Sequence, residues 1–418
     1  MEERNYLIPQ FGPFRGMRVI GAGSLIAMPF AASLLAEFGA EFIQIERPKV
    51  GDTYRKFLPV ARGPLGEVSS AWVQEARNRL SMTLKMDMKN PDSREIFYGL
   101  IEKSDVFMEN LLWLKRYGLD DKKLLEINPR LVIVHISGYG HKEFGGIPEI
   151  CSQASYDMAG QSFSGYALYN GYPDRPPQLT APALNDYVTA MFALFGVLAA
   201  YTEAQRSGRG QVVDVSQYES QAKIMRDAFT RHSLGVGEIF RNGNQNPDAQ
   251  PWDVYVSRDG KYVSVGAVGE IVYGRFLDAL GLSRKKYPFL KAATGKEAVS
   301  SELGQELAAI TREWFESHDA DEIERVMRKA RVPCSRINSP AESMEHPHYN
   351  ARQDFISYTD ESLGQEVRAF GVFPKLSETP GRVWRGAPTL GQDTERILRE
   401  LLGMDEEKIR GLRRRGIV

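Results

Sequence analysis

Short apolar runs alternate with helical segments along the first half of the chain, and this alternation limits the possible folds more than any other feature. The predicted strands are 17–21, 41–46, 105–109, 131–135 and 211–215. Segments with apolar residues at helical spacing lie between them, at 29–38, 91–103, 120–126 and 183–205. Parallel strands need long crossover connections, which such helices supply. The pattern predicts an α/β fold with a parallel sheet covered by helices on both faces.

The pattern changes beyond about Asn242, where a smaller domain is expected. A hairpin and then two helices follow, at 252–265, 273–280 and 302–317. This order predicts an α+β domain. The length of 418 residues suits two or three domains. The expected division is 1–222 for the first part of a large domain, 223–312 for the small domain, 313–336 for a linker and 337–418 for a C-terminal segment that returns to the large domain.

The charge balance and the scarcity of cysteine argue against several classes of function. With 53 basic and 54 acidic residues, the net charge of −1 does not favour a nucleic-acid partner. Cys151 and Cys334 are too far apart for a disulfide framework or a zinc site, and they indicate a reducing compartment. His346 and His348 are two residues apart, but no cluster of ligands accompanies them, so no metal is expected.

Nothing in the sequence predicts a membrane partner. The best apolar segment, 188–201, is shorter than the roughly 18 residues that a membrane span needs, and it is interpreted as a buried helix. Residues 1–5 lack the basic and then apolar order of a signal peptide. We therefore expect a cytoplasmic location.

The turn after the first predicted strand is a candidate phosphate site. Gly21-Ala-Gly23 ends that strand and Glu46 ends the next one, which superficially matches a dinucleotide fingerprint. Ile26 occupies the third glycine position, where a branched side chain would obstruct close packing of helix and strand. An ordinary strand-to-helix turn, or a site for another phosphate-bearing cofactor that includes Arg47-Pro-Lys49, remains open.

Asp186 stands where the apolar helix 183–205 is predicted to begin. An acid at this position is commonly stabilised by the helix dipole, and Asn185 beside it competes for the capping role. The same position suits a nucleophile, because the helix end keeps a carboxylate ionised and offers N–H groups to developing negative charge. The residues alone leave both interpretations open. His135 lies in an apolar strand and is interpreted as a core histidine rather than a base.

Further short motifs occur in a fixed order from about Phe11 to the C-terminus, and together they resemble the class III CoA-transferases, the family of formyl-CoA, carnitine and bile-acid CoA-transferases. The matching segments include Leu35-Ala-Glu-Phe-Gly-Ala-Glu41, Ile45-Glu-Arg-Pro48, Val106-Phe-Met-Glu-Asn110, Ile127-Asn-Pro-Arg-Leu131, Ile136-Ser-Gly-Tyr-Gly140, Ser207-Gly-Arg-Gly-Gln211 and Trp384-Arg-Gly-Ala-Pro388. Ser155-Tyr-Asp157 through Phe163-Ser-Gly-Tyr166 is most similar to the carnitine and bile-acid branch.

The resemblance implies a Rossmann-like large domain, a small α+β domain and an interlocked homodimer, in which two subunits are threaded through each other. It also implies that Asp186 is the nucleophile. Its carboxylate would attack the thioester of a donor acyl-CoA to form a mixed anhydride, which the CoA thiolate then converts to an aspartyl-CoA thioester. The implied partners are acyl-CoA and a small carboxylic acid. A carboxylate needs neither base nor metal for this chemistry at neutral pH.

Contacts to CoA carry over from the family position by position. The implied CoA-binding residues are Ser24, Ile26, Ala27, Arg47, Met86, Lys89, Asn110, Leu111 and Arg116, and the implied substrate-binding residues are Tyr156 and Asp157. Arg47 suits the adenosine phosphates of CoA. The glutamine that the formyl-CoA branch has in the first loop is replaced by Ile26, and the glycine-rich loop of that branch is absent, which argues against oxalate and formyl-CoA.

A racemase and a non-catalytic CoA-binding protein are the two alternatives to a CoA-transferase. Racemases of 2-methylacyl-CoA share this architecture, but the position of their histidine holds Tyr156 here. A non-catalytic CoA-binding protein would have no use for Asp186. The expected acceptor is a carnitine or betaine-type acid, slightly preferred over a bile-acid-type acid or another organic acid. Aromatic residues available for a cation cage are Tyr156, Tyr166, Tyr187, Trp252 and Tyr255.

Overall fold

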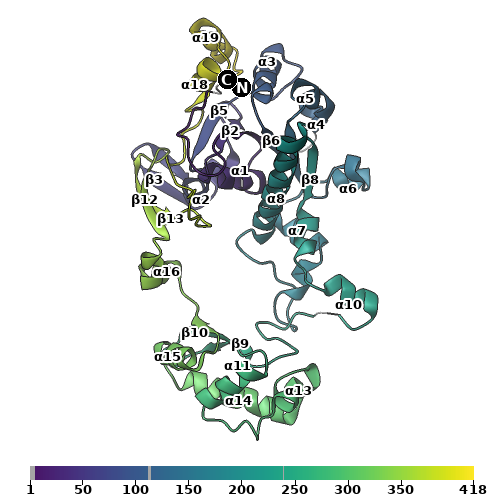
Figure 1. The fold of residues 1–418 in the computed structure, drawn as a ribbon, viewed down its shortest axis with the longest axis vertical. Coiled ribbons are helices and arrows are strands. Elements are labelled where there is room, and N and C mark those ends of the chain that lie inside the picture. The colour runs from purple at the N-terminus through teal and green to yellow at the C-terminus, as the bar shows by residue number, and fades with distance from the viewer. Residues whose placement is uncertain (1–4, 112–113, 239) are drawn as a thin grey trace. The chain divides into compact units, whose positions relative to one another are not determined.

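The computed structural model describes residues 5–111, 114–238 and 240–418, and the chain divides into two compact units (Figure 1). The large unit contains Met1–Tyr166, Thr180–Asp227 and His348–Val418, and the small unit contains Ala167–Leu179 and Ala228–Pro347. Residues 1–4, which carry most of the prediction about a signal peptide, lie outside the described residues. The four-part division expected from the sequence stays a prediction.

A parallel sheet of six strands forms the large unit, which confirms the predicted α/β class. Its order is β5-β2-β1-β6-β7-β8, and every neighbouring pair is parallel. The strands are β1 (Arg18–Ala22), β2 (Glu41–Glu46), β5 (Arg79–Thr83), β6 (Val106–Glu109), β7 (Val132–Ser137) and β8 (Val212–Ser216). The apolar pattern alone did not predict strand β5, because Arg79 and Ser81 interrupt it.

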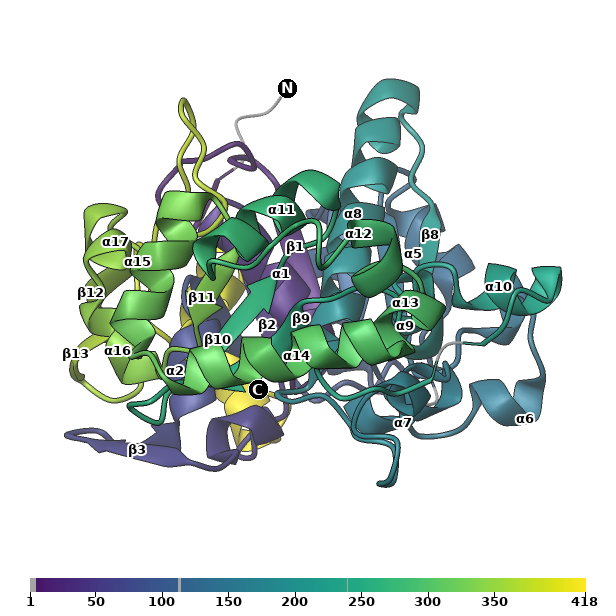
Figure 2. The same ribbon diagram turned by 90° about the horizontal axis from the view of Figure 1, so that it is seen from below.

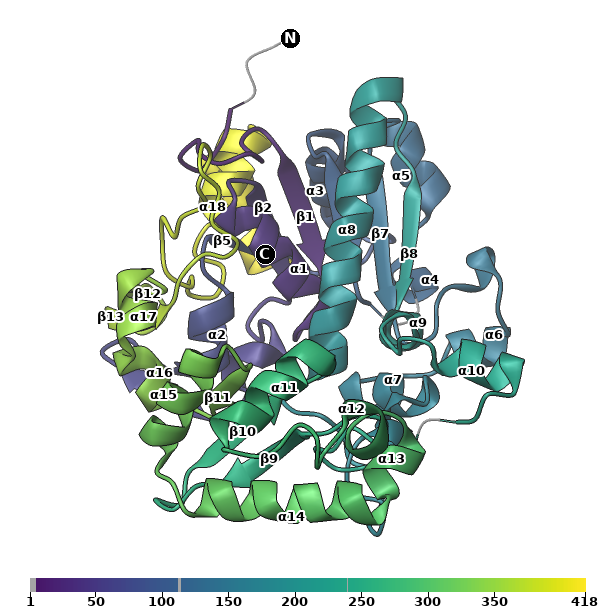
Figure 3. The same ribbon diagram turned by 60° about the horizontal axis from the view of Figure 1, so that its bottom comes forward.

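Helices cover both faces of this sheet because alternate strand residues point to opposite sides. Val19 of β1 packs with α1 (Ala27–Glu37) and α8 (Leu184–Ser207) in one core cluster, and Figure 3 shows these two helices against the strands. Ile20 packs in a second cluster. That cluster involves α3 (Pro91–Glu102), α5 (Asp121–Ile127), the π-helical turn Ile397–Leu401 that follows α18 (Thr394–Arg396), and α19 (Glu406–Arg414).

The C-terminal segment packs against the edge strand β5. The Ser81 amide donates to the Asp393 carboxylate at 2.8 Å, and the Thr83 amide donates to the Thr394 hydroxyl at 2.9 Å. Further elements of the large unit are β3 (Val60–Gly63), β4 (Gly66–Ser69), α2 (Ser70–Glu75), α4 (Leu114–Tyr117), α6 (Pro148–Cys151), α7 (Asp157–Phe163), α9 (Gln217–Lys223), β12 (Phe355–Asp360) and β13 (Gln365–Phe370).

The small unit contains a three-stranded sheet in the order β11-β10-β9, with antiparallel pairing throughout. Its strands are β9 (Trp252–Val256), β10 (Tyr262–Gly266) and β11 (Cys334–Arg336). Its helices are α10 (Ala228–Leu234), α11 (Glu270–Ala279), α12 (Phe289–Ala292), α13 (Lys296–Ser300), α14 (Glu302–Glu316), α15 (Ala320–Ala330) and α16 (Pro340–Glu345), and α17 (Pro347–Ala351) begins at the boundary between the units. Figure 2 shows α14 beside β9. Phe276 and Phe315 are buried in the core of the small unit, as expected for an α+β domain.

Helix α8 is the one helix of the described chain that is long and apolar enough to cross a membrane. A third of its most apolar stretch (33%) is buried, and core helices of globular proteins pass the same test. The helix starts at the carboxyl edge of the sheet, where the candidate site lies.

Candidate active site

A cavity of about 700 Å³ lies beyond the carboxyl ends of β1, β2 and β5. Strand order runs outward in both directions from the pair β1 and β6, so this pair is the switch point of the sheet. Open α/β sheets bind their ligands outside the carboxyl ends of strands near such a point. The cavity therefore occupies the expected place for a cofactor or nucleotide-containing substrate.

Most of the residues that the resemblance assigned to CoA line this cavity. They are Ser24, Arg47, Met86, Lys89, Leu111 and Arg116. Lys85 also lines it and was missed in the sequence, although it comes two residues after the strand β5, which ends at the same edge. The side chains of Arg47, Lys85, Lys89 and Arg116 are exposed cations and suit a ligand with several phosphate groups.

Three predicted CoA contacts do not line the cavity. Asn110 instead joins the two loops at the switch point: its Oδ1 accepts from the Ser24 amide at 3.0 Å, and its Nδ2 donates to the Ser24 carbonyl at 2.9 Å. Ile26 packs against a separate apolar cluster with Trp72, and Ala27, the first residue of α1, is buried in the core. Direct contact of these three residues with CoA stays a prediction.

Glu46 at the end of β2 is part of a buried ion pair rather than a free acid. Arg55 binds both of its carboxylate oxygens, at 2.6 and 2.7 Å, and the Ser81 hydroxyl donates to it at 2.6 Å. Burial raises the pKa of Glu46, but the hydrogen bonds and charge of Arg55 outweigh burial and hold the pKa below its ordinary value. A carboxylate engaged in this way cannot serve the ribose hydroxyls of a dinucleotide.

Asp186 lies in the first turn of α8, at the same edge of the sheet. Three elements meet around it: α7, the start of α8, and α9 directly after β8. The Nε2 of Gln217, the first residue of α9, donates to Oδ1 of Asp186 at 2.5 Å. Gln217 was not singled out in the sequence, and its only signal there is its place directly after the strand 211–215.

Burial raises the pKa of Asp186 to about 6, with a further contribution from the charge of Asp157, and the hydrogen bond from Gln217 acts in the opposite direction. The helix end was expected to keep this carboxylate fully ionised, but the carboxylate is mostly ionised only when the pH exceeds this raised pKa. At neutral pH the anionic form still predominates, and a desolvated carboxylate is a stronger nucleophile than a solvated one.

Asp157 caps α8 from the neighbouring helix α7. Its Oδ1 accepts from the backbone amides of Asn185 at 2.7 Å and of Asp186 at 3.4 Å, and its Oδ2 accepts from Gln161 at 2.7 Å. The amides expected to face developing negative charge are therefore already used. Asn185 does not cap the helix with its own side chain, because its Nδ2 donates to the Gln217 carbonyl.

The aromatic residues proposed for a cation cage are dispersed. Tyr156 is 67% exposed at the start of α7. Tyr187 donates its hydroxyl to Glu75 at 2.5 Å and packs edge-on against Phe30. Trp252 and Tyr255 belong to the small unit, where Tyr255 stacks on a core phenylalanine. The five rings are therefore divided between the two units of the chain.

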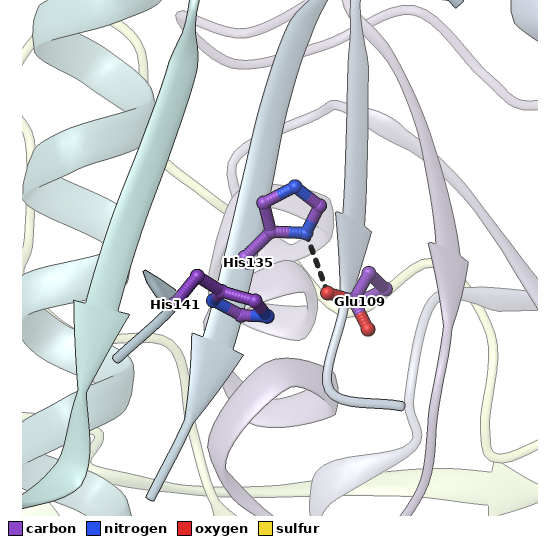
Figure 4. A group of neighbouring side chains, drawn as sticks. All are labelled: Glu109, His135 and His141. Atoms are coloured by element: carbon purple, nitrogen blue, oxygen red, sulfur yellow. Dashed lines mark hydrogen bonds and ion pairs between the residues drawn. The ribbon is translucent and has the colours of Figure 1, made fainter. Parts of the chain in front are cut away.

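Glu109, His135 and His141 come together with ligand atoms within 4.8 Å of one another (Figure 4). His135 is buried, and its two ring nitrogens lie 2.6 Å from Glu109 and 3.0 Å from Asp121. Burial lowers the pKa of His135, but hydrogen bonds and charge from both carboxylates outweigh it and raise the pKa to about 10. Both ring nitrogens of His135 are thus engaged by carboxylates, and Glu109, His135 and Asp121 form a buried ionic clamp.

This clamp supports the cavity. Glu109 accepts from His135 through one oxygen and from the Leu111 amide through the other, at 2.5 Å. Leu111 lines the cavity, so the buried histidine holds the loop after β6 through Glu109. The interpretation of His135 as a structural residue agrees with these contacts.

Comparison with known proteins gives consistent matches over nearly the full chain. Residues 14–394 match CoA-transferase family III. The bile acid CoA-transferase BaiK of Clostridium scindens is 36% identical, over 98% of this chain and 90% of its own length. The alpha subunit of succinyl-CoA–L-malate CoA-transferase from Chloroflexus aurantiacus is 35% identical, over 97% and 92%. The L-carnitine CoA-transferase of Proteus mirabilis is 29% identical, over 98% and 97%.

Solved structures show the same fold. A CAIB/BAIF family protein from Brucella suis superposes with a TM-score of 0.79 at 24% identity, over 94% of this chain and all of that one. Rv3272 from Mycobacterium tuberculosis gives a TM-score of 0.74 at 18% identity, over 93% and 99%.

Proposed function

The chain belongs to CoA-transferase family III, and we propose that it moves CoA from an acyl-CoA donor to a free carboxylic acid through covalent intermediates on Asp186. The observation that carries the proposal is the half-buried Asp186 carboxylate, held by Gln217 at the sheet edge that also bears the cation-lined cavity.

The proposed reaction has four steps. Asp186 attacks the thioester carbonyl of the donor, and the C–S bond breaks to give a mixed anhydride and CoA thiolate. The thiolate attacks the aspartyl carbonyl and expels the donor acid as its carboxylate, which leaves an aspartyl-CoA thioester. The acceptor carboxylate attacks this thioester, and the thiolate leaves. Finally the thiolate attacks the acceptor carbonyl of the second anhydride, which releases the new acyl-CoA and the Asp186 carboxylate.

The separation of the cavity from Asp186 suits this substrate. Asp186 contacts Gln217 at the end of β8, and the cavity lies at the ends of β1, β2 and β5. Strands β1 and β8 are three strand spacings apart in the sheet, roughly 14 Å. We propose that the phosphates bind at Arg47 and the neighbouring cations, and that the flexible pantetheine arm carries the thioester along the sheet edge to Asp186.

The proposed acceptor is a bile-acid-type acid ahead of a carnitine-type acid. A relative named for bile acids shares 36% of its residues with this chain, against 29% for one named for L-carnitine. Tyr156, which directly precedes α7, and Phe163, its last residue, are more than half exposed, and we propose their apolar surface as part of the acceptor site.

Incubation of the protein with succinyl-CoA or a bile-acyl-CoA and a panel of free acids tests the function. The panel contains a bile acid, L-malate and L-carnitine, and chromatography with mass spectrometry detects the new thioester. We expect CoA transfer, with the bile acid preferred. The proposal fails if no pair gives a new thioester, or if solvent deuterium enters the α-position of a 2-methylacyl-CoA without any transfer.

Arg47→Ala is expected to raise KM for the acyl-CoA about tenfold at nearly unchanged kcat, because roughly 1.4 kcal/mol of phosphate binding is lost equally in the ground and transition states. Arg62→Ala is the matched control, since Arg62 is 83% exposed on the hairpin strand β3 and pairs with Glu67. Steady-state kinetics at two salt concentrations measure the change. An unaltered KM for Arg47→Ala would remove Arg47 from the proposed site.

We also propose an interlocked homodimer. Phe195 and Met191 of α8 are 71% and 48% exposed. A groove of about 580 Å³ in the large unit is bordered by α1, α8 and the segment after β13, and its lining is mostly apolar. Exposed apolar surface of this kind marks contacts between proteins, and a second copy of the chain is the occupant that the family resemblance implies. A cytoplasmic location stays a prediction.

A further inference from the structure

The Gln217 amide joins the nucleophile to the segment that precedes α7. Gln217 is only 7% exposed. Its Nε2 donates to Asp186 at 2.5 Å, and its Oε1 accepts from the Ser155 hydroxyl at 2.6 Å. A carboxylate only accepts hydrogen bonds, so the amide nitrogen has to face Asp186, and the Ser155 hydroxyl fixes the same orientation from the other side.

Gln217 is the single side-chain donor that reaches the Asp186 carboxylate among the residues that the structure describes. The amides at the start of α8 donate to Asp157 instead. The carbonyl oxygen that the Asp186 carboxylate becomes after acylation therefore lies against Gln217 Nε2. Hydrogen-bond donors aimed at an oxygen where charge develops are the most effective electrostatic catalysts.

We propose that Gln217 is the oxyanion donor for the two steps in which the aspartyl carbonyl is attacked. This inference rests on the proposed function. In the second step the thiolate sulfur adds to Cγ of Asp186, and the carbonyl electron pair moves onto the oxygen bound by Gln217. Collapse of the tetrahedral species reforms the carbonyl, breaks the C–O bond and releases the donor carboxylate with that electron pair.

The third step uses the same donor. The acceptor carboxylate adds to Cγ of the aspartyl thioester, the same oxygen carries the charge, and the C–S bond breaks to release the thiolate. In the first and fourth steps the charge develops on a carbonyl oxygen of the substrate, which Gln217 does not contact. Gln217 therefore stabilises the transition states of the second and third steps only. A neutral carbonyl accepts a weaker hydrogen bond than an oxyanion, so the contact strengthens as these two transition states form.

Gln217→Met tests the inference because it keeps the length of the side chain and removes the donor. We expect kcat to fall about 10²–10³-fold, with a change in the intermediate that accumulates. In a rapid quench with acyl-CoA alone, the intact mass of the wild type shows the CoA adduct, whereas the variant retains the acyl adduct of the mixed anhydride. Gln221→Met is the matched control, since Gln221 is a buried glutamine one turn later on α9 whose Oε1 accepts from Asn185 Nδ2 at 3.0 Å.

The pH profile gives a second readout, which reports the hydrogen bond from Gln217 to the resting Asp186 carboxylate. The Gln217 hydrogen bond lowers the pKa of Asp186, so the acid limb near pH 6 moves to higher pH in Gln217→Met. The groups that face Asp186 from its neighbouring helices, Asp157 on α7 and Tyr187 on α8, are unchanged in the variant.

Gln217→Glu keeps the shape and covers the case in which the methionine variant fails to fold. Its side chain donates only when protonated, so its activity relative to the wild type should be greater at pH 5.5 than at pH 8. The inference is overturned if Gln217→Met forms the CoA adduct at the wild-type rate, if Gln221→Met shows the same loss, or if Gln217→Glu lacks this pH dependence. Failure of the wild type to form either adduct would instead refute the nucleophilic role of Asp186.

Discussion

Asp186→Asn is expected to abolish CoA transfer, with a loss on the order of 10⁴–10⁶-fold, because it replaces the carboxylate oxygen that is proposed to attack the donor thioester with a non-nucleophilic amide nitrogen. Asparagine has nearly the same shape and still presents an oxygen to Gln217 Nε2, whose contact at 2.5 Å orients the wild-type carboxylate. The surroundings of the site should thus be preserved. Binding of CoA should change little, since the cavity at β1, β2 and β5 does not include Asp186.

Three measurements together make this result decisive. Initial rates of thioester formation give the loss of activity, calorimetry gives the affinity for CoA, and hydroxylamine trapping followed by mass spectrometry locates the reactive carbonyl. The hydroxamate should form on Asp186 of the wild type during turnover and be missing from the variant. Glu203→Gln is the control, because Glu203 is an exposed acid near the other end of α8. An initial rate of thioester formation by Asp186→Asn within tenfold of the wild-type rate would refute the proposed mechanism.

Arg55→Met is expected to destabilise the protein by about 3–5 kcal/mol, because it leaves the buried Glu46 without its cation. Arg55 contacts both Glu46 oxygens, donates to the Pro388 carbonyl at 2.8 Å, and lies 3.9 Å from the centre of the Trp72 ring. The variant therefore loses an ion pair and a hydrogen bond to the C-terminal segment. The melting midpoint should fall by roughly 6–10 °C.

The dependence of this effect on pH and on Glu46 distinguishes the buried charge from a simple loss of packing. The folded-state pKa of Glu46 is depressed, so its contribution is present above the unfolded-state pKa and is lost as pH falls through the folded value. The gap between wild type and Arg55→Met should therefore narrow in acid. Adding Glu46→Gln should restore part of the stability at pH 7. Additive losses in the double variant would contradict this explanation.

The parallel sheet could be predicted from the apolar pattern of the sequence, whereas the strand β5 and the contacts of the acids could not. Five strands are apolar runs between helical segments, but β5 carries Arg79 and Ser81 among its residues, and both side chains are buried through hydrogen bonds to distant parts of the chain. Periodicity detects apolar burial alone. The same limit hid the pairing of Glu46 with Arg55, which depends on tertiary contact.

Site residues that directly follow strands could be predicted from the sequence. Site residues that are held by hydrogen bonds between separate helices could not. Arg47 and Lys89, which the resemblance assigned to CoA, both follow strands and both line the cavity. Gln217 and the capping of α8 by Asp157 depend on three helices that meet at one edge, and 28 residues or more separate the partners in sequence. No local motif encodes such contacts, so the donor to Asp186 became visible only in the folded chain.

The cation-lined cavity and the Asp186 cluster are built on opposite halves of one sheet, and this separation has a consequence for how the enzyme can diversify. Substitutions on α7 or around β8 can reshape the proposed acceptor site without touching the proposed phosphate contacts beside β1 and β2. Under this proposal, selection can exchange one acceptor for another while the binding of CoA stays the same. Relatives named for bile acid, malate and carnitine at 29–36% identity are consistent with such a history. Engineering of acceptor preference should accordingly begin at α7.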